Sequence, residues 1–320
     1  KLAQLSDQHG LGLSEACFAK LNSTSGGMTP GLAYAQAVSR LRSGDPEGAK
    51  AFLTEAASKG GDDLRWQMAM AQFLDLTGSA DALKLWVAIA EKAPDDAALL
   101  RTILDSRTAW NDLALIDRVI ERLKSATGEN AVNWRVARAR WMMLSDDSPK
   151  AAAEAAALLN ETMQISVPEA QRYTLLASAL EKLGNIQGAI ESLEQAVQVA
   201  PEMAGVHFEL ARLLSTRGES DRAKAEVEKV LASKSLTEDD RRRAAGILAR
   251  GNDVGRAIGI LEAFHQEKGD TVPLDLQLAQ LYRSAGQLDK AEAIFKRFLA
   301  ESPNDLAIGL AADLYATQGR

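Results

Sequence analysis

Apolar residues between positions 170 and 200 follow the spacing of two amphipathic helices. The first stretch is Tyr173, Leu176, Ala177 and Leu180, and the second is Ile186, Ala189, Ile190, Leu193, Ala196 and Val197. Steps of three and four residues place each stretch on one face of a helix. Gly184 stands between them, and glycine ends a helix at low steric cost because it tolerates the left-handed conformation. The pattern predicts a helix pair that closes at Pro201.

The same pattern recurs every 34 residues along the chain. Three columns show it: Leu176, Leu210, Ala244 and Leu278; Ala189, Ala223, Ala257 and Ala291; and Leu193, Val227, Leu261 and Phe295. Trp66 and Trp134 extend the period into the N-terminal half, because they are two periods apart. A fixed period of this length is typical of a solenoid, in which each unit buries its apolar face against its neighbours.

The period divides the chain into helical units. They open near Pro30, Asp63, Ala97, Ala131, Ala170, Ala204, Glu238 and Val272. We therefore expect an N-terminal helical segment at 1–29, about eight helix pairs at 30–304 with an irregular unit at 131–169, and an unpaired first helix of a truncated repeat at 305–320. Because this last helix would lack its partner, the pattern also predicts that both ends were trimmed from a longer protein and that Leu310 and Leu314 mediate self-association.

These residues resemble the tetratricopeptide repeat. One unit matches its pattern at Tyr173, Leu176, Ala177, Leu180, Gly184, Ala189, Leu193, Ala196 and Pro201, and another at Leu278, Ala279, Tyr282, Gly286, Ala291, Phe295, Phe298 and Pro303. The resemblance implies an all-α, right-handed solenoid that acts as a non-enzymatic scaffold. It also implies that a protein or peptide partner lies in the concave groove, without a cofactor.

In that family the groove is lined by fixed positions of the first helix of each pair. Carried over to this chain, they include Tyr34, Gln67, Arg135, Thr174, Ser178, Phe208, Arg212, Arg242, Gln280 and Arg283. Four of these are arginines in an otherwise acidic protein. Guanidinium groups bind carboxylates through paired hydrogen bonds, so the resemblance and the residue types together favour an acidic partner segment. Solvated surface arginines remain the alternative interpretation.

Composition narrows the choice of partner. The 320 residues carry 37 basic and 44 acidic side chains, a net charge of −7, which argues against nucleic acid as the main ligand. No stretch approaches the roughly 20 apolar residues of a membrane span. The single cysteine, Cys17, excludes an intrachain disulfide framework and is expected to be a buried apolar residue.

Candidate catalytic and metal-binding residues have structural interpretations. The three histidines are far apart in sequence, and His207 occupies a core position of a first helix. The acidic pairs Asp62-Asp63, Asp95-Asp96 and Asp239-Asp240 each precede a helix, where carboxylates cap free N–H groups. The tryptophans Trp66, Trp86, Trp134 and Trp141 fall on core positions, whereas Trp110 is the least constrained by the period. We therefore predict no catalytic residue and no metal site.

Two expectations concern departures from the pattern and the setting of the chain. In the unit near Glu238, Arg241 replaces the usual aromatic residue, and Gly251 is expected to end the first helix early. The alanine-rich array is similar to large bacterial repeat proteins of the cell envelope, including those that accompany exopolysaccharide export, which implies a periplasmic location. The alternative is a regulatory or substrate-recruiting array of a larger enzyme.

Overall fold

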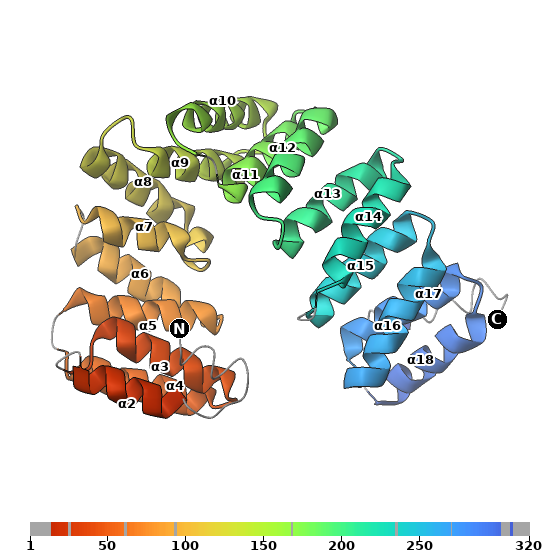
Figure 1. The fold of residues 1–320 in the computed structure, drawn as a ribbon, viewed down its shortest axis with the longest axis horizontal. Helices are drawn as coiled ribbons and strands as arrows, with labels where there is room; N and C mark the ends of the chain where they lie inside the picture. The colour runs from red at the N-terminus through yellow and green to blue at the C-terminus, as the bar shows by residue number, and fades with distance from the viewer. Residues whose placement is uncertain are drawn as a thin grey trace. The chain divides into compact units, whose positions relative to one another are not determined.

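The structure of the chain is a computed structural model that describes residues 14–24, 27–60, 63–92, 95–167, 169–233, 236–269, 271–301 and 308–309 (Figure 1). Within these ranges it contains 17 α-helices, one short 3₁₀ turn and no strand, so the predicted all-α repeat fold is confirmed. The predicted helix at 305–320 and its apolar residues Leu310 and Leu314 lie outside the described residues. The chain divides into two compact units, Lys1–Asp147 and Ser148–Arg320.

Paired helices make up the first unit. They are α2 (Ser14–Thr24), α3 (Pro30–Arg42), α4 (Pro46–Ser58), α5 (Leu64–Leu76), α6 (Asp81–Lys92), α7 (Ala97–Asp105), the 3₁₀ turn η1 (Ala109–Asn111), α8 (Leu113–Thr127) and α9 (Val132–Ser145). Helices α3 and α4, α5 and α6, and α7 and α8 pack together as pairs. Their buried side chains form two hydrophobic clusters, one centred on Phe73 and Trp66 and the other on Trp86 and Ile116.

The second unit continues the same arrangement. Its helices are α10 (Pro149–Ile165), α11 (Ala170–Lys182), α12 (Ile186–Val199), α13 (Ala204–Thr216), α14 (Ser220–Leu231), α15 (Glu238–Arg250), α16 (Val254–Lys268), α17 (Val272–Ser284) and α18 (Leu288–Glu301). Each helix packs against the next, and α15 also packs against α13 and α17. The odd-numbered helices from α11 to α17 are the first members of their pairs, and α13, α15 and α17 lie beside one another as a layer.

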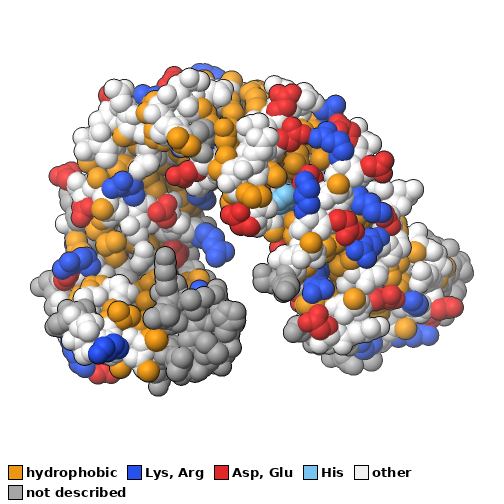
Figure 2. All heavy atoms as spheres, in the orientation of Figure 1, with side chains coloured by type: hydrophobic (Ala, Val, Ile, Leu, Met, Phe, Trp, Pro, Cys, Tyr) orange, Lys and Arg blue, Asp and Glu red, His pale blue; other side chains and the backbone are white. Residues whose placement is uncertain are grey.

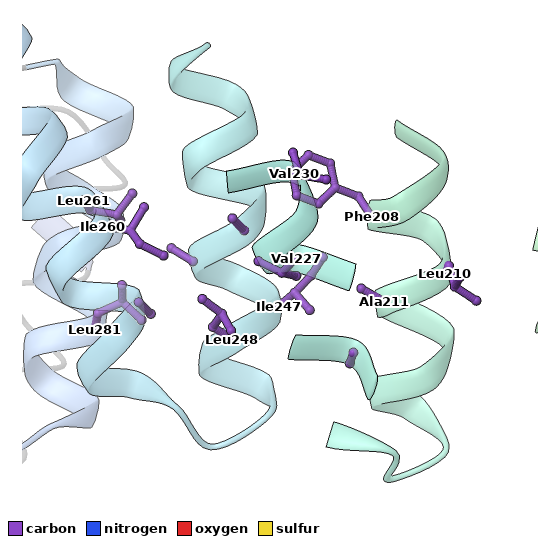
Figure 3. Close-up of a cluster of buried hydrophobic side chains, with 14 of the residues drawn as sticks. Phe208, Leu210, Ala211, Val227, Val230, Ile247, Leu248, Ile260, Leu261 and Leu281 are labelled. Carbon is purple, nitrogen blue, oxygen red and sulfur yellow. The ribbon is translucent and has the colours of Figure 1, made fainter. Parts of the chain in front are cut away.

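One continuous hydrophobic cluster joins helices α11 to α18 of the second unit. Figure 3 shows Phe208 and Ala211 reaching from α13 toward Val227 and Val230 of α14, while Leu210 points to the other side of its helix. The periodic alanines Ala189, Ala223, Ala257 and Ala291 are buried in this cluster. Their small side chains let neighbouring helices approach closely, which is why the alanine column recurs with the repeat.

The turns within the pairs explain one wrong expectation. Gly184, Gly218 and Gly286 have positive φ angles of 74°, 80° and 73°, and Asn252 takes the equivalent place with φ 64°. Asparagine is one of the few residues that tolerates this conformation. Gly251 therefore does not shorten its helix: α15 has 13 residues, as do α11, α13 and α17. The period is kept because Asn252 makes the turn.

Trp110, the tryptophan that the period constrains least, is also a core residue. Its side chain is buried, at 8% exposed, and its indole N–H donates a 2.8 Å hydrogen bond to the Leu104 carbonyl. The guanidinium of Arg140 lies 3.9 Å from the centre of the ring. In this pair α7 ends at Asp105, and η1 replaces the glycine turn. Trp110 is thus the residue that fills the space beside the shortened helix.

The other structural interpretations fit the observed contacts. Trp66, Trp86 and Trp134 are buried, and the carboxylates of Asp63 and Asp96 accept hydrogen bonds from backbone N–H groups at the starts of α5 and α7. Trp141 is half-buried, and its indole N–H bonds to the backbone. The Asp239-Asp240 pair contributes to a capping box, in which Thr237 and Asp240 bond to each other's backbone N–H groups.

Polar side chains occupy the aromatic core position in the last three pairs. His207, at 4% exposed, lies 2.7 Å from Glu226 and 2.8 Å from the Pro201 carbonyl oxygen. Asp275, at 2% exposed, is paired with Arg297 at 2.5 Å. Arg241 places its guanidinium over the ring of Phe264, 5.0 Å from the centroid, and lies 3.6 Å from Glu267. In each pair, contacts with the second helices replace the packing of an aromatic ring.

Ion pairs connect the second helices of successive pairs at equivalent positions. They are Glu194–Arg222 at 2.5 Å between α12 and α14, Glu228–Arg256 at 3.0 Å between α14 and α16, and Glu262–Lys290 at 3.1 Å between α16 and α18. Their spacing along the chain follows the repeat, so each acidic residue and each basic residue recurs after one period. We call these three ion pairs the rungs.

Candidate binding groove

An open cleft lies across the first helices α13, α15 and α17 of the second unit. Its volume is about 860 Å³. The lining consists of Phe208, Glu209 and Arg212 from α13; Asp239, Arg242, Arg243, Gly246, Ile247, Ala249 and Arg250 from α15; and Val272, Pro273, Leu276, Gln277, Gln280, Leu281 and Ser284 from α17. Apolar side chains thus share the cleft with arginines, glutamines and two carboxylates.

The lining covers most of the length of two helices. On α15 the lining extends from Asp239 to Arg250, and on α17 from Val272 to Ser284. These stretches correspond to about 16 Å and about 18 Å at the rise of an α-helix. The contribution of α13 is shorter, from Phe208 to Arg212. We call this cleft, which crosses α13, α15 and α17, the trough.

Two arginines of the cleft are paired with carboxylates of the protein itself. Arg212 donates hydrogen bonds of 2.7 and 2.6 Å to Glu181 of α11 and one of 2.9 Å to Glu209. The hydrogen bonds with Glu181, and secondarily those with Glu209, hold the pKa of Arg212 above its ordinary value. Arg243 lies 3.1 Å from Glu209 and 4.9 Å from the ring centre of Phe208. These two guanidinium groups tie α11, α13 and α15 together.

The other two arginines of the lining, Arg242 and Arg250, have different contacts. Arg242 donates through Nε to the side-chain oxygen of Gln277 at 3.2 Å, and the Gln277 amide donates back to the Arg242 carbonyl at 2.8 Å. Among the described residues, neither Arg242 nor Arg250 forms an ion pair. Arg250 is exposed. The lining contains four arginines and two carboxylates, and three of the arginines are on α15. The unbalanced positive charge of the trough therefore lies on α15.

Gly246 lies between these two arginines, one helical turn from each. A Cβ at this position would be 3.7 Å from the amide nitrogen of Gln277 and 3.8 Å from a guanidinium nitrogen of Arg250. Both are ordinary contact distances. The glycine therefore leaves a shallow recess in the middle of α15, and a larger side chain there would extend into the trough.

The structure brings together four of the predicted site residues: Phe208, Arg212, Arg242 and Gln280 line the trough. Phe208 does so as a buried ring at 1% exposed. Arg283 is on α17 but is not part of the lining. Gly246, Gln277 and Arg250 were missed, although the three- and four-residue steps from Arg242 along α15 place Gly246 and Arg250 on its face.

The other predicted residues lie elsewhere. Thr174 and Ser178 are on α11, and both hydroxyls donate to carbonyls one turn earlier in the same helix. Tyr34, Gln67 and Arg135 belong to the first unit. Burial raises the pKa of the Tyr34 hydroxyl, Gln67 accepts from Lys92 at 3.4 Å, and Arg135 donates to the Glu129 carbonyl at 3.1 Å. The structure thus divides the predicted site between the two units.

Figure 2 shows blue and red side chains interleaved over the second unit on the face turned to the viewer. Groups of three or more His, Cys, Asp or Glu side chains that could hold a metal ion are absent from the described ranges. Within the same ranges no helix is long and apolar enough to cross a membrane.

A model of the tetratricopeptide repeat family matches the sequence twice, over residues 180–251 and 248–314. Residues 180–314 of this chain, less than half of its length, therefore match the tetratricopeptide repeat family. The matched segments include α13, α15 and α17, so the trough is built from these repeats. A comparison with curated protein sequences finds no match.

Several solved structures resemble this chain in fold. Yeast Tom70 has 15% identity and a TM-score of 0.57, over 86% of this chain and 61% of its own. A chain of the APC/C hetero-tetramer Cut9–Hcn1 has 14% identity and a TM-score of 0.53, over 86% and 55%. The human IFIT1 dimer with PPP-AAAA has 14% identity and a TM-score of 0.52, over 94% and 82%. This chain thus spans less than two thirds of the first two, and the similarity concerns the fold.

Proposed function

We propose that this protein is a scaffold that binds a segment of a partner protein in the trough of α13, α15 and α17. The tetratricopeptide repeats support the general function, because arrays of this kind present extended surfaces to other proteins. The observation that carries the location is the trough itself: an open cleft of about 860 Å³ that crosses three first helices. Cut9 offers a parallel among proteins of similar fold, since it was solved in a hetero-tetramer with Hcn1.

The mixed lining favours a peptide segment over a small molecule. Val272, Pro273 and Ala249 provide accessible apolar contacts, while Gln277 and Gln280 offer amide groups that can pair with a peptide backbone. The excess of arginine over carboxylate in the lining supports the predicted acidic character of the partner. The overall charge of −7 makes nucleic acid a poor alternative.

Gly246 provides a direct test of this proposal. We expect Gly246→Phe to fill the middle of the trough and to abolish capture of the partner by the intact protein from a cell extract. The matched control is Gly259→Phe, because Gly259 is an exposed glycine of α16 outside the trough, with nothing within 4 Å of its missing Cβ. Circular dichroism would establish that both variants fold.

The outcome depends on the difference between the two variants. A protein that is captured by the wild type and by Gly259→Phe, and is lost with Gly246→Phe, supports binding in the trough. Equal capture by both variants contradicts it. The identity of the captured protein, an enzyme or a component of an export system, would then show in which larger assembly the scaffold acts.

A further inference from the structure

We infer that His207 is held as the doubly protonated imidazolium in the folded chain and that its contacts form a proton-dependent latch on α13. The latch consists of His207 on α13, Glu226 on α14 and the carbonyl group of Pro201 in the turn between α12 and α13. This inference is independent of the proposed binding function, because these three residues are not part of the trough lining.

The first step is the surroundings of the ring. The side chain of His207 is buried, at 4% exposed, so the protein itself must satisfy both ring nitrogens. Nδ1 lies 2.7 Å from a carboxylate oxygen of Glu226, and Nε2 lies 2.8 Å from the carbonyl oxygen of Pro201. A neutral imidazole has one N–H, so its other nitrogen would face an oxygen acceptor with a lone pair. The imidazolium donates to both oxygens.

The second step indicates that Nε2 carries a hydrogen. Trp134 occupies the corresponding core position of α9. Its indole N–H, which can only donate, bonds to the carbonyl of Gly128 at 3.1 Å, six residues earlier in the chain. Pro201 is also six residues before His207. His207 therefore contacts the same backbone acceptor that binds a donor in the earlier pair.

The third step places the second proton on the ring and not on the carboxyl group. Glu226 accepts a 2.7 Å hydrogen bond from Lys229 through its other oxygen. Burial by itself would raise the pKa of the Glu226 carboxyl group, but the hydrogen bonds from Lys229 and His207 have the larger combined effect and lower the pKa. Glu226 is therefore ionised at neutral pH and accepts from Nδ1 in a charge-assisted hydrogen bond.

The charged groups on the helices that pack against α13 have their own partners. On α14, Glu226 contacts the ring and Lys229 contacts Glu226. On α15, Arg243 is paired with Glu209 of α13. On α12, the acidic residue of the first rung is paired with α14. Among the residues that the structure describes, Glu226 is thus the one ionised side chain that bonds to the ring.

The latch couples the stability of the second unit to pH. The ordinary pKa of a histidine side chain in an unfolded chain is about 6.5. Above that pH the folded chain holds a proton that the unfolded chain has released, so stability falls as the pH rises until the latch itself loses its proton. Below that pH both states are protonated and the contribution is complete. Loss of the proton weakens the attachment of α13, which is also one of the helices of the trough.

Nitrogen-15 NMR of the chain labelled at histidine tests the protonation state directly. At about pH 7.5 we expect both ring nitrogens of His207 to show the chemical shifts of N–H groups, whereas a histidine of ordinary pKa is mostly neutral there. The variant His207→Phe assigns the signals, because they disappear in its spectrum. One protonated and one unprotonated ring nitrogen for His207 at this pH would overturn the inference.

Urea unfolding between about pH 6.5 and about pH 8 tests the consequence for stability. For the wild type we expect the equilibrium constant of folding to fall by up to about tenfold per pH unit, the change for one proton. His207→Phe should fold, because Trp134 shows that an aromatic ring fits this core position, and it should lack this slope.

The matched control is His265→Gln, which removes a histidine whose side chain is 34% exposed. It should keep the slope of the wild type. A slope that persists in His207→Phe, or that is lost in His265→Gln, contradicts the assignment of the proton to the latch.

Discussion

At the scale of single residues, Gly60 shows how tightly the first unit is packed. A Cβ at Gly60 would lie 2.0 Å from Nε1 of the buried Trp66 side chain. We expect Gly60→Ala to destabilise the protein by about 1–3 kcal/mol, because the indole must move out of its packed position. Urea denaturation monitored by circular dichroism would measure the change.

Gly31 is the matched control. It lies in α3, and nothing is within 4 Å of its missing Cβ. Gly31→Ala should leave stability unchanged or raise it by up to about 1 kcal/mol, because alanine favours the helix. Similar destabilisation by both substitutions would show that the Trp66 contact is not the cause.

Glu226 links buried polar contacts to pH. Burial alone raises the pKa of its carboxyl group, but hydrogen bonds from Lys229 and His207 outweigh the burial and lower the pKa. A carboxyl group with a lowered pKa in the folded state stabilises the protein above its unfolded-state pKa of about 4.3. This contribution is lost as the pH falls through the lower folded-state value.

We therefore expect Glu226→Gln to destabilise the protein at pH 7 by about 1.5–3 kcal/mol, the range for a hydrogen bond to a charged group. The difference between the wild type and the variant should shrink as the pH falls below about 4. Urea titrations at several pH values would measure it. A difference that is constant with pH would contradict a role for the ionised carboxylate.

At the scale of helices, the rungs offer a repeated and therefore comparable interaction. Their side chains are about one third to one half exposed. Exposed ion pairs contribute about 0.2–1 kcal/mol each. A double-mutant cycle with Glu228→Gln and Arg256→Gln should therefore give a coupling energy of about 0.5 kcal/mol that decreases in high salt. A coupling near zero at low salt would mean that the rungs do not stabilise the stack.

The helices also show what a sequence can predict. The helix pairing follows from the recurrent apolar positions, because each unit has the same core to fill. The sequence did not reveal that Asn252, rather than the preceding Gly251, would take the left-handed conformation of the turn. A turn glycine one position earlier also fits the repeat pattern. The sequence also could not show that Arg212 is bound to Glu181, because that pair joins two helices whose relative rotation is set by packing. Side-chain pairing across helices therefore limited the prediction of the site.

At the scale of the molecule, the two compact units have separate hydrophobic clusters. In repeat proteins stability comes from contacts between neighbours, so a sufficiently long part of the array can fold alone. We expect residues 148–320 to form a helical, cooperatively unfolding fragment that retains the trough. Circular dichroism and thermal unfolding of the isolated fragment would test this, and a fragment without a cooperative transition would contradict it.

The rungs have a consequence for how such a chain can grow. Each rung takes its acid from one helix pair and its base from the next, and every internal pair of the series supplies both. Gene duplication of a single 34-residue segment would add one complete pair together with the charges that join it to both neighbours. An array of this kind can therefore lengthen in evolution one unit at a time, without creating an unmatched charge at any junction.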